Sequence, residues 1–168
     1  LVAGGLDAAP RDVNRVAELY EPVLQQSFDG GRRELAPALI TTELTSAEMI
    51  KYAANAFLAT KISFANEIAQ MCELFGADVR EVLPAIGADH RISRAFLNPG
   101  VGWGGSCFGK DVAALIASSQ EYGYTPSMLE ATVDINQAQR ASAVRKLQRE
   151  LHSLKGRRIA LLGLAFKP

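Results

Sequence analysis

The chain has 168 residues, of which 48 % are hydrophobic and 21 % are charged, and its formal net charge at pH 7 is zero. A chain of this length can bury a real hydrophobic core, so we expect one compact domain, or one domain with parts of two others. Balanced charge argues against a nucleic-acid partner and against a polybasic membrane binder. No apolar run approaches bilayer length and no leader sequence opens the chain, so we expect no membrane partner either.

The two cysteines do not form a disulfide framework in a chain of this size. Cys72 falls within a helical pattern and is expected in the core, whereas Cys107 lies in a glycine-rich loop. This usage favours a reducing, cytoplasmic location. His90 and His152 have no partner at the spacing of a metal site or a catalytic dyad, so we expect no metal.

The N-terminal part reads as strand, helix, strand. Residues 1–5 resemble the end of a strand, and residues 10–24 carry apolar side chains at helical spacing. Residues 37–42 form a short, partly β-branched run whose proline stands at its first position, where a strand tolerates one.

A long helix is expected next. Thr45 and Glu48 form a capping box that would open it, and Gly76 would close it. At 1.5 Å per residue such a helix is roughly 45 Å long, longer than one face of a small domain requires. Its apolar residues cover more than one stripe, which predicts burial on several sides and a role spanning two domains.

The remaining elements are mostly helical. Helices are predicted over residues 78–86 and 110–122, and a third from the capping box at Ser127 to about residue 152. Residues 159–164 have the pattern of a buried parallel strand. The chain does not begin with Met, and we expect it to be a piece of a longer protein.

The loop before Cys107 contains Gly100, Gly102, Gly104 and Gly105. Glycines allow positive φ and close approach to a ligand, so this loop could wrap a polar substrate. Because a helix is predicted to begin near Lys110, the thiol would lie near a helix N-terminus and a lysine, and both favour the thiolate. These features indicate a nucleophile, with a small buried cysteine as the alternative.

Lys51 and Asn55 are four residues apart in the long predicted helix, so they share one face and can point at the same atom. On spacing alone, an exposed lysine beside a polar residue is the simpler interpretation.

Two motifs together resemble the UDP-glucose/GDP-mannose dehydrogenase family. Residues 104–111, Gly-Gly-Ser-Cys-Phe-Gly-Lys-Asp, preceded by the Phe-Leu-x-Pro-Gly-x-Gly of residues 96–102, are similar to its active-site loop. Residues 48–57 are similar to its Lys-x-x-x-Asn helix. The resemblance continues through residues 87–92 and 163–167 and so covers nearly the whole chain.

The family resemblance implies a mainly α fold: a helical central domain like the C-terminal domain of the 6-phosphogluconate dehydrogenase superfamily, with a long connecting helix. Remnants of two Rossmann-like α/β domains would flank it. Residues 1–43 would end the NAD-binding domain, residues 44–154 would form the central dimerisation domain with the catalytic cysteine, and residues 155–168 would start the domain that binds the UDP-sugar. A homodimer through the central helices is implied.

The implied activity is an NAD-dependent, four-electron oxidation of the C6 hydroxyl of a nucleotide sugar, UDP-glucose to UDP-glucuronate. Cys107 would form a thiohemiacetal and then a thioester, and Lys51 and Asn55 would stabilise the oxyanions. Asp111 would orient or deprotonate the hydrolytic water; its simpler role is to favour the helix dipole.

The resemblance also implies binding residues. Arg91 would either reach the substrate of a neighbouring subunit or form a surface salt bridge. Gly105 and Lys110 would contact NAD. The remaining substrate contacts are expected from the loop and from the last motif: Phe96, Leu97, Asn98, Pro99, Gly100, Gly102, Gly104, Phe166 and Lys167.

Three other interpretations remain. Ser106 favours the glucose and mannose enzymes, so GDP-mannose is the second substrate choice. A non-catalytic helical dimerisation module would not require a glycine-dense loop around a thiol. A thiol hydrolase would require a histidine base, which nothing in the sequence ties to Cys107. Gly109 stands where relatives often have proline or glutamine.

Most cofactor contacts are expected elsewhere in the whole protein, so we expect this segment alone to be inactive.

Overall fold

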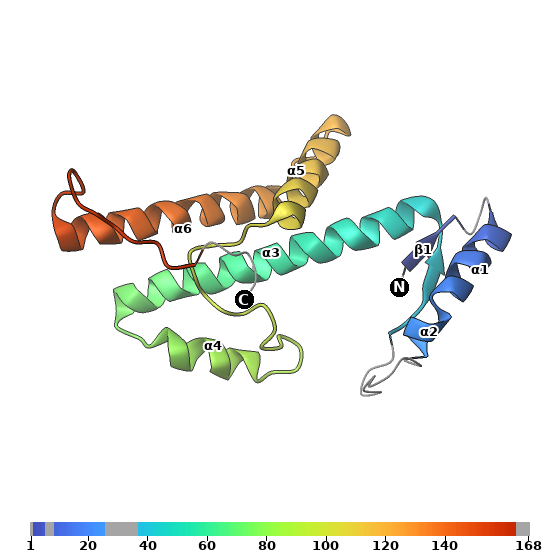
Figure 1. The fold of residues 1–168 in the computed structure, drawn as a ribbon, viewed down its shortest axis with the longest axis horizontal. Coiled ribbons are helices and arrows are strands. Elements are labelled where there is room, and N and C mark those ends of the chain that lie inside the picture. The colour runs from blue at the N-terminus through green and yellow to red at the C-terminus, as the bar shows by residue number, and fades with distance from the viewer. Residues whose placement is uncertain (1, 6–8, 26–36, 164–168) are drawn as a thin grey trace. The chain divides into compact units, whose positions relative to one another are not determined.

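A computed structural model describes residues 2–5, 9–25 and 37–163 (Figure 1). The chain divides into two compact units, residues 1–54 and residues 55–168. Each unit is described by itself.

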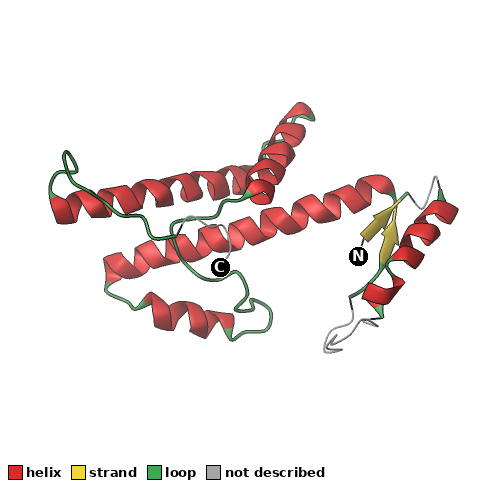
Figure 2. Ribbon diagram, in the orientation of Figure 1, coloured by secondary structure: helices red, strands yellow, loops and turns green. Residues whose placement is uncertain are grey.

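The first unit contains a small parallel sheet. Strand β1 (Val2–Gly4) pairs with β2 (Ile40–Thr42), with Val2 opposite Ile40 (Figure 2). Between the two strands the chain forms α1 (Pro10–Leu19) and α2 (Glu21–Leu24). Because parallel neighbours need a crossover, this order agrees with the predicted strand, helix, strand.

The single helix predicted over residues 10–24 is interrupted at Tyr20. The cause is Pro22, which lies in the first turn of α2. Proline cannot donate a backbone hydrogen bond, and its ring clashes with the carbonyl four residues earlier, so α1 ends and a new helix begins.

The long helix α3 (Leu44–Phe75) has 32 residues and runs without a break. It starts one residue before Thr45, so Thr45 does not serve as the predicted N-cap. Its C-terminal end agrees with prediction: Gly76 has φ +74° and the N–H of Ala77 donates to the carbonyl of Cys72 at 3.0 Å. Such a bond over a left-handed residue is how helices commonly close.

The second unit is built around the part of α3 from Asn55 onward. Helix α4 (Val79–Gly87) lies on one side of it, and α5 (Ser106–Glu121) and α6 (Ser127–Leu151) lie on the other (Figure 1). Two small clusters of buried apolar side chains hold these layers together. One cluster contains Ala56, Ala59, Trp103 and Val112, and the other contains Ala65, Leu83 and Leu97.

Helices α3 and α6 run in the same direction, and polar side chains link them along their length. Thr60 Oγ1 lies 3.1 Å from Thr132 Oγ1, Gln70 Nε2 donates to Gln139 Oε1 at 2.8 Å, and Lys146 pairs with Glu73. Since the numbers rise together on both helices, the pair is parallel.

Two further predictions are corrected. Ser127 is the first residue of α6 and makes no capping hydrogen bond, because the chain enters the helix from Pro126 instead. Residues 159–163 form no strand, and Leu161 and Leu162 are exposed. An extended segment is stabilised as a strand only by hydrogen bonds to a neighbour, and no described residue pairs with this one.

The described part of the chain is mainly helical, as the sequence predicted. Within that part, no helix is both long and apolar enough to span a membrane.

Candidate active site

Helix α5 begins four residues earlier than expected, at Ser106 rather than near Lys110. Gly105 makes this possible, because it stands just before the helix with φ +83°, a backbone conformation that residues other than glycine rarely adopt. Cys107 is therefore inside the first turn of α5, and it is exposed. The N–H groups of a first turn have no partner within the helix, so this position favours negative charge.

Asp111 lies one turn after Cys107 on the same face of α5. Its side chain is only 1 % exposed. Each carboxylate oxygen has a donor: Asn55 Nδ2 donates to Oδ2 at 2.6 Å and Lys110 Nζ donates to Oδ1 at 2.8 Å. A buried carboxylate is tolerated only with such partners, so Asn55, Lys110 and Asp111 form one connected group.

Lys51 belongs to the first unit and lies one helical turn before Asn55 in α3. Its Nζ is 5.7 Å from the centre of the Tyr52 ring. Both residues lie in the continuous helix α3, so they have the i, i+4 spacing that the sequence predicted.

The predicted substrate loop has mixed surroundings. Leu97 is 1 % exposed and packs in a core cluster, so only its backbone can face a ligand. Asn98, Pro99 and Gly100 are exposed. Phe96 has φ +60° and packs edge-on against Phe108, which follows Cys107 directly.

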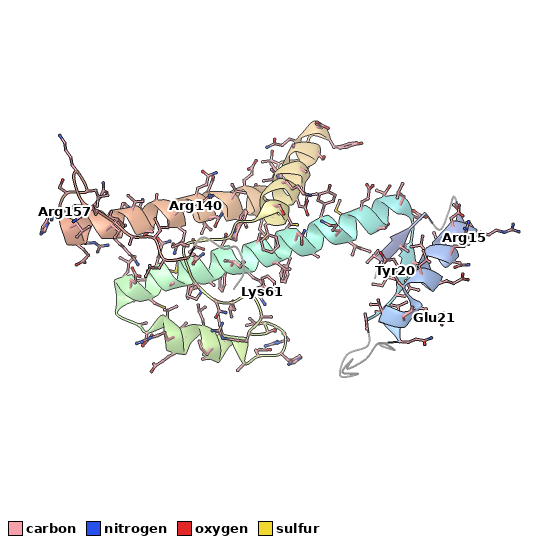
Figure 3. All side chains as sticks on the ribbon, viewed as in Figure 1. Arg15, Tyr20, Glu21, Lys61, Arg140 and Arg157 are labelled. Atoms are coloured by element: carbon pink, nitrogen blue, oxygen red, sulfur yellow. The ribbon has the colours of Figure 1, made fainter. Side chains whose placement is uncertain are left out.

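The loop after α4 is held by a lysine that the sequence did not indicate. Lys61 of α3, labelled in Figure 3, donates from Nζ to the backbone oxygens of Ile92 at 2.8 Å and Ser93 at 3.3 Å. These bonds fix the segment that leads into Phe96.

Arg91 is exposed and pairs with Asp89, its Nη2 atom lying 2.6 Å from Oδ2. This side-chain hydrogen bond lowers the pKa of Asp89 and raises that of Arg91. In this chain the guanidinium thus makes the salt bridge that the sequence offered as one of its two roles.

Gly104 is exposed, and a Cβ added there would meet no atom within 4 Å. Phe166 and Lys167 lie outside the described residues. Among the residues that the structure describes, no group of three or more His, Cys, Asp or Glu side chains could hold a metal ion.

Sequence reasoning missed a set of polar side chains that hold the glycine loop between α3 and α6: Ser63, Asn66, Asn136 and Gln139. The first three are buried. Their positions in the helices could have indicated this role, because polar side chains on the apolar face of a helix need a hydrogen-bond partner.

Comparison with known protein families matches the central part of the chain. The model of the UDP-glucose/GDP-mannose dehydrogenase family, central domain, matches residues 45–138, which is more than half of the chain. The chain belongs to this family.

Individual relatives agree with this family membership. The UDP-glucose 6-dehydrogenase AglM of Haloferax volcanii is 48 % identical over 158 residues, covering 94 % of this chain and 35 % of the relative. The UDP-glucose 6-dehydrogenase TuaD of Bacillus subtilis is 55 % identical over 130 residues, covering 77 % of this chain and 28 % of the relative. The chain therefore spans about a third of the length of these curated relatives.

One solved structure is similar to nearly the whole of this chain. The UDP-glucose dehydrogenase of the hyperthermophilic archaeon Pyrobaculum islandicum has a TM-score of 0.84 and 33 % sequence identity, covering 98 % of this chain and 35 % of that one. The helical central fold that the resemblance implied is confirmed by this likeness.

Proposed function

We propose that the chain forms the central part of an NAD-dependent UDP-glucose 6-dehydrogenase, which oxidises the C6 hydroxymethyl group of UDP-glucose to a carboxylate. The main observation behind this proposal is that the exposed thiol of Cys107 lies one helical turn from the buried carboxylate of Asp111, which accepts hydrogen bonds from Asn55 and Lys110. The names of the similar proteins support the substrate.

The proposed organisation has three parts. Residues 1–43 end an NAD-binding domain, residues 44–154 form the central domain, and residues 155–168 begin a domain that binds the nucleotide. The parallel pairing of β1 and β2 supports the first assignment, because parallel strands with a helical crossover are typical of such domains. Since most cofactor contacts would come from elsewhere in the whole protein, the segment alone should be inactive.

Cys107 acts as the nucleophile in this mechanism. The C6 alcohol first loses a hydride and its hydroxyl proton and becomes an aldehyde. The sulfur of Cys107 adds to the C6 carbon of this aldehyde, and the carbonyl oxygen becomes an oxyanion that takes up a proton to give a thiohemiacetal. Loss of the C6 hydride and of the hydroxyl proton converts the thiohemiacetal to a thioester. Water then attacks the thioester carbon, the thiolate leaves, and the carboxylate is released.

Bound NAD⁺ would supply the hydride acceptor for the alcohol and thiohemiacetal oxidations. Gly105 and Lys110 are the residues of this chain proposed to face it. They fit such a group, since Gly105 presents backbone without a side chain and the Lys110 side chain is a cation that is 67 % exposed. An exposed cation beside the site suits an anionic dinucleotide.

Lys51 and Asn55 are proposed to stabilise the oxyanion at each tetrahedral stage, the lysine by its charge and the amide by its N–H groups. Asp111 orients the hydrolytic water. Because both of its oxygens already accept a hydrogen bond, orientation suits it better than full proton removal.

The backbone of residues 96–104 is proposed to hold the sugar nucleotide, with Phe166 and Lys167 contributing from the following domain and Arg91 from a neighbouring subunit. Both thiols are free, which fits a reducing cytoplasm.

The decisive experiment measures NADH formed per UDP-glucose by the whole protein and by its Cys107→Ser variant. The wild type should form about two NADH per sugar, and the variant should lose nearly all turnover because serine is a far weaker nucleophile. Cys72→Ala is the matched control, since Cys72 is the buried cysteine and Cys107 the exposed one; it should keep its activity.

Other outcomes discriminate among the alternatives. Turnover with GDP-mannose instead of UDP-glucose would keep the mechanism and change the substrate. Normal turnover in Cys107→Ser would overturn the nucleophile. No oxidation of any nucleotide sugar by the whole protein would favour the helical dimerisation module.

A further inference from the structure

Three amide side chains from two different helices form hydrogen bonds to the backbone of the glycine loop. Asn66 comes from α3, and Asn136 and Gln139 come from α6. All of their loop bonds go to the peptide groups of Gly100 and Trp103. We call these three residues the amide clamp.

Asn136 binds both polar groups of Trp103. The backbone N–H of Trp103 donates to Oδ1 at 2.7 Å, and Nδ2 of Asn136 donates to the Trp103 carbonyl at 3.0 Å. Asn136 is 1 % exposed and Trp103 is 9 % exposed, so water does not compete. The indole is also fixed, because Nε1 donates to Ser63 Oγ at 2.9 Å. A buried, two-point bond allows the loop only one position.

Gly100 is held from both sides. Its N–H donates to Asn66 Oδ1 at 2.7 Å, and its carbonyl accepts from Gln139 Nε2 at 2.6 Å. Gln139 is itself oriented by Gln70 of α3, whose Nε2 donates to Oε1 at 2.8 Å. The polar pairing of α3 with α6 and the position of the loop are therefore one network.

Asn66 is fully buried, and within the described residues its Nδ2 group has no hydrogen-bond partner. Burying an amide with an unsatisfied donor opposes folding. Its bond to Gly100 is thus the interaction that Asn66 supplies, which indicates a role in the loop rather than in helix packing.

Gly102 shows how closely the clamp approaches. It has φ +115°, and a Cβ there would lie 2.4 Å from Oδ1 of Asn136. Any side chain at this position would push the loop off the amide. The loop needs glycine here so that Asn136 can reach the next peptide group.

The clamp acts close to the nucleophile. Only Gly104 and Gly105 separate Trp103 from the start of α5, which carries Cys107 in its first turn. The Trp103 ring also packs edge-on against Phe108, with centroids 6.3 Å apart. Trp103 is therefore coupled to the thiol in two ways: by a connection of only two residues to the start of α5, and by ring packing against the residue that follows Cys107.

We propose that Asn66, Asn136 and Gln139 are positioning residues that hold the glycine loop and thereby place Cys107 for attack on the C6 carbon. The proposal rests on the proposed function for the attack itself, but the placement of the thiol can be measured without turnover.

The test compares the whole protein with its Asn136→Leu and Thr60→Val variants. Asn136→Leu keeps the approximate volume and removes both bonds to Trp103. Thr60→Val is the matched control, because Thr60 bonds to Ala56 within α3 and to Thr132 of α6, and neither partner belongs to the loop. Iodoacetamide labelling of Cys107 and of Cys72 is followed by mass spectrometry, alongside NADH formation and thermal melting.

In Asn136→Leu the kcat should fall about tenfold or more, since misplacing a reacting group costs rate rather than cofactor binding. The KM for NAD should stay within about twofold of wild type. The labelling rate of Cys107 should change by about threefold or more while buried Cys72 stays protected. Thr60→Val should change none of these.

Unchanged Cys107 labelling and kcat in Asn136→Leu would overturn the proposal. Faster labelling of Cys72 in parallel with Cys107 would also overturn it, because it would show general loosening instead of loop placement. If Asn136→Leu does not fold, Gln139→Met replaces it, and the same change in Cys107 labelling is expected on a smaller scale. Absence of turnover in the wild type would sink the proposed function while labelling still decides the clamp.

Discussion

Asp111 is the residue at which folding and chemistry depend on the same contacts. A carboxylate that is 1 % exposed is unfavourable unless its charge is compensated. Lys110 provides the charge and Asn55 a further donor, while the Lys110 side chain remains 67 % exposed. Removing the carboxylate would therefore not strand a buried cation, and the reaction should suffer more than the fold.

Replacing Asp111 by Asn tests this expectation. The side-chain shape is kept and an oxygen can still accept from Asn55, but the negative charge is lost. Turnover of UDP-glucose should fall by roughly 10² to 10⁴, as is typical when an acid–base group is removed. If water orientation is lost, an acyl adduct should accumulate on Cys107, which intact-protein mass spectrometry detects.

Asp134→Asn on the exposed face of α6 is the control, since it removes the same charge away from the site. Wild-type turnover in Asp111→Asn would contradict the assigned role. A large fall in melting temperature would assign Asp111 to the fold instead.

At the scale of elements, α4 illustrates a well-formed helix start. The side chain of Asp78 caps the helix by accepting from the N–H of Arg80 at 2.8 Å, and the Arg80 guanidinium pairs with it at 2.6 Å. The side-chain bond to Arg80, followed by the backbone bond, lowers the pKa of Asp78 to about 2.

We expect Arg80→Ala to raise the pKa of Asp78 only part of the way to 3.8, because the backbone bond remains. The carboxyl carbon shift in an NMR titration measures this. The folded pKa lies below the usual 3.8, so the stabilising effect is complete above that value and disappears as the pH falls through about 2.

The chain contains its own control for this prediction. Asp89 and Arg91 repeat the same contact two residues apart, with the pKa of Asp89 also lowered. Arg91→Ala should raise the pKa of Asp89 and leave that of Asp78 unchanged. An unchanged pKa of Asp78 in Arg80→Ala would contradict the assigned cause.

Helix interiors were predictable from the sequence and helix ends were less so. The extent of α3 and the left-handed Gly76 agree with prediction, because an unbroken helical pattern and a positive φ leave strong signals. The predicted burial of α3 on several sides is not found in the described residues, where Phe57 and Phe75 are 64 % and 81 % exposed. Both capping boxes, at Thr45 and Ser127, failed to form, and α5 started early at Gly105. Capping energies are about 1 kcal/mol, so competing starts one turn away are readily chosen.

The same limit applied to the candidate site. Cys107, Lys51, Asn55 and Asp111 stand in motifs that the sequence displays. The amide clamp does not, because an asparagine in a helix can equally face solvent. Only tertiary packing reveals that Asn66 and Asn136 turn toward a loop.

At the scale of the whole molecule, α3 carries an apolar stripe that its own unit leaves open. Phe57, Phe64 and Met71 are 64 %, 45 % and 43 % exposed, and they are spaced seven residues apart. That spacing places them on one face of the helix. A row of large apolar side chains along one helix is unfavourable in water, and we propose that a second copy of the chain covers it.

Phe64→Glu should therefore dissociate the proposed homodimer, because it places a charge at the middle of the stripe where a partner would have to desolvate it. Size-exclusion chromatography with light scattering should show the mass of the whole protein halved. Tyr124→Glu is the control, since Tyr124 is 67 % exposed in the turn before α6 and off the stripe. A wild-type protein that is monomeric at all concentrations, or a dimer indifferent to Phe64→Glu, would show that this face has another role.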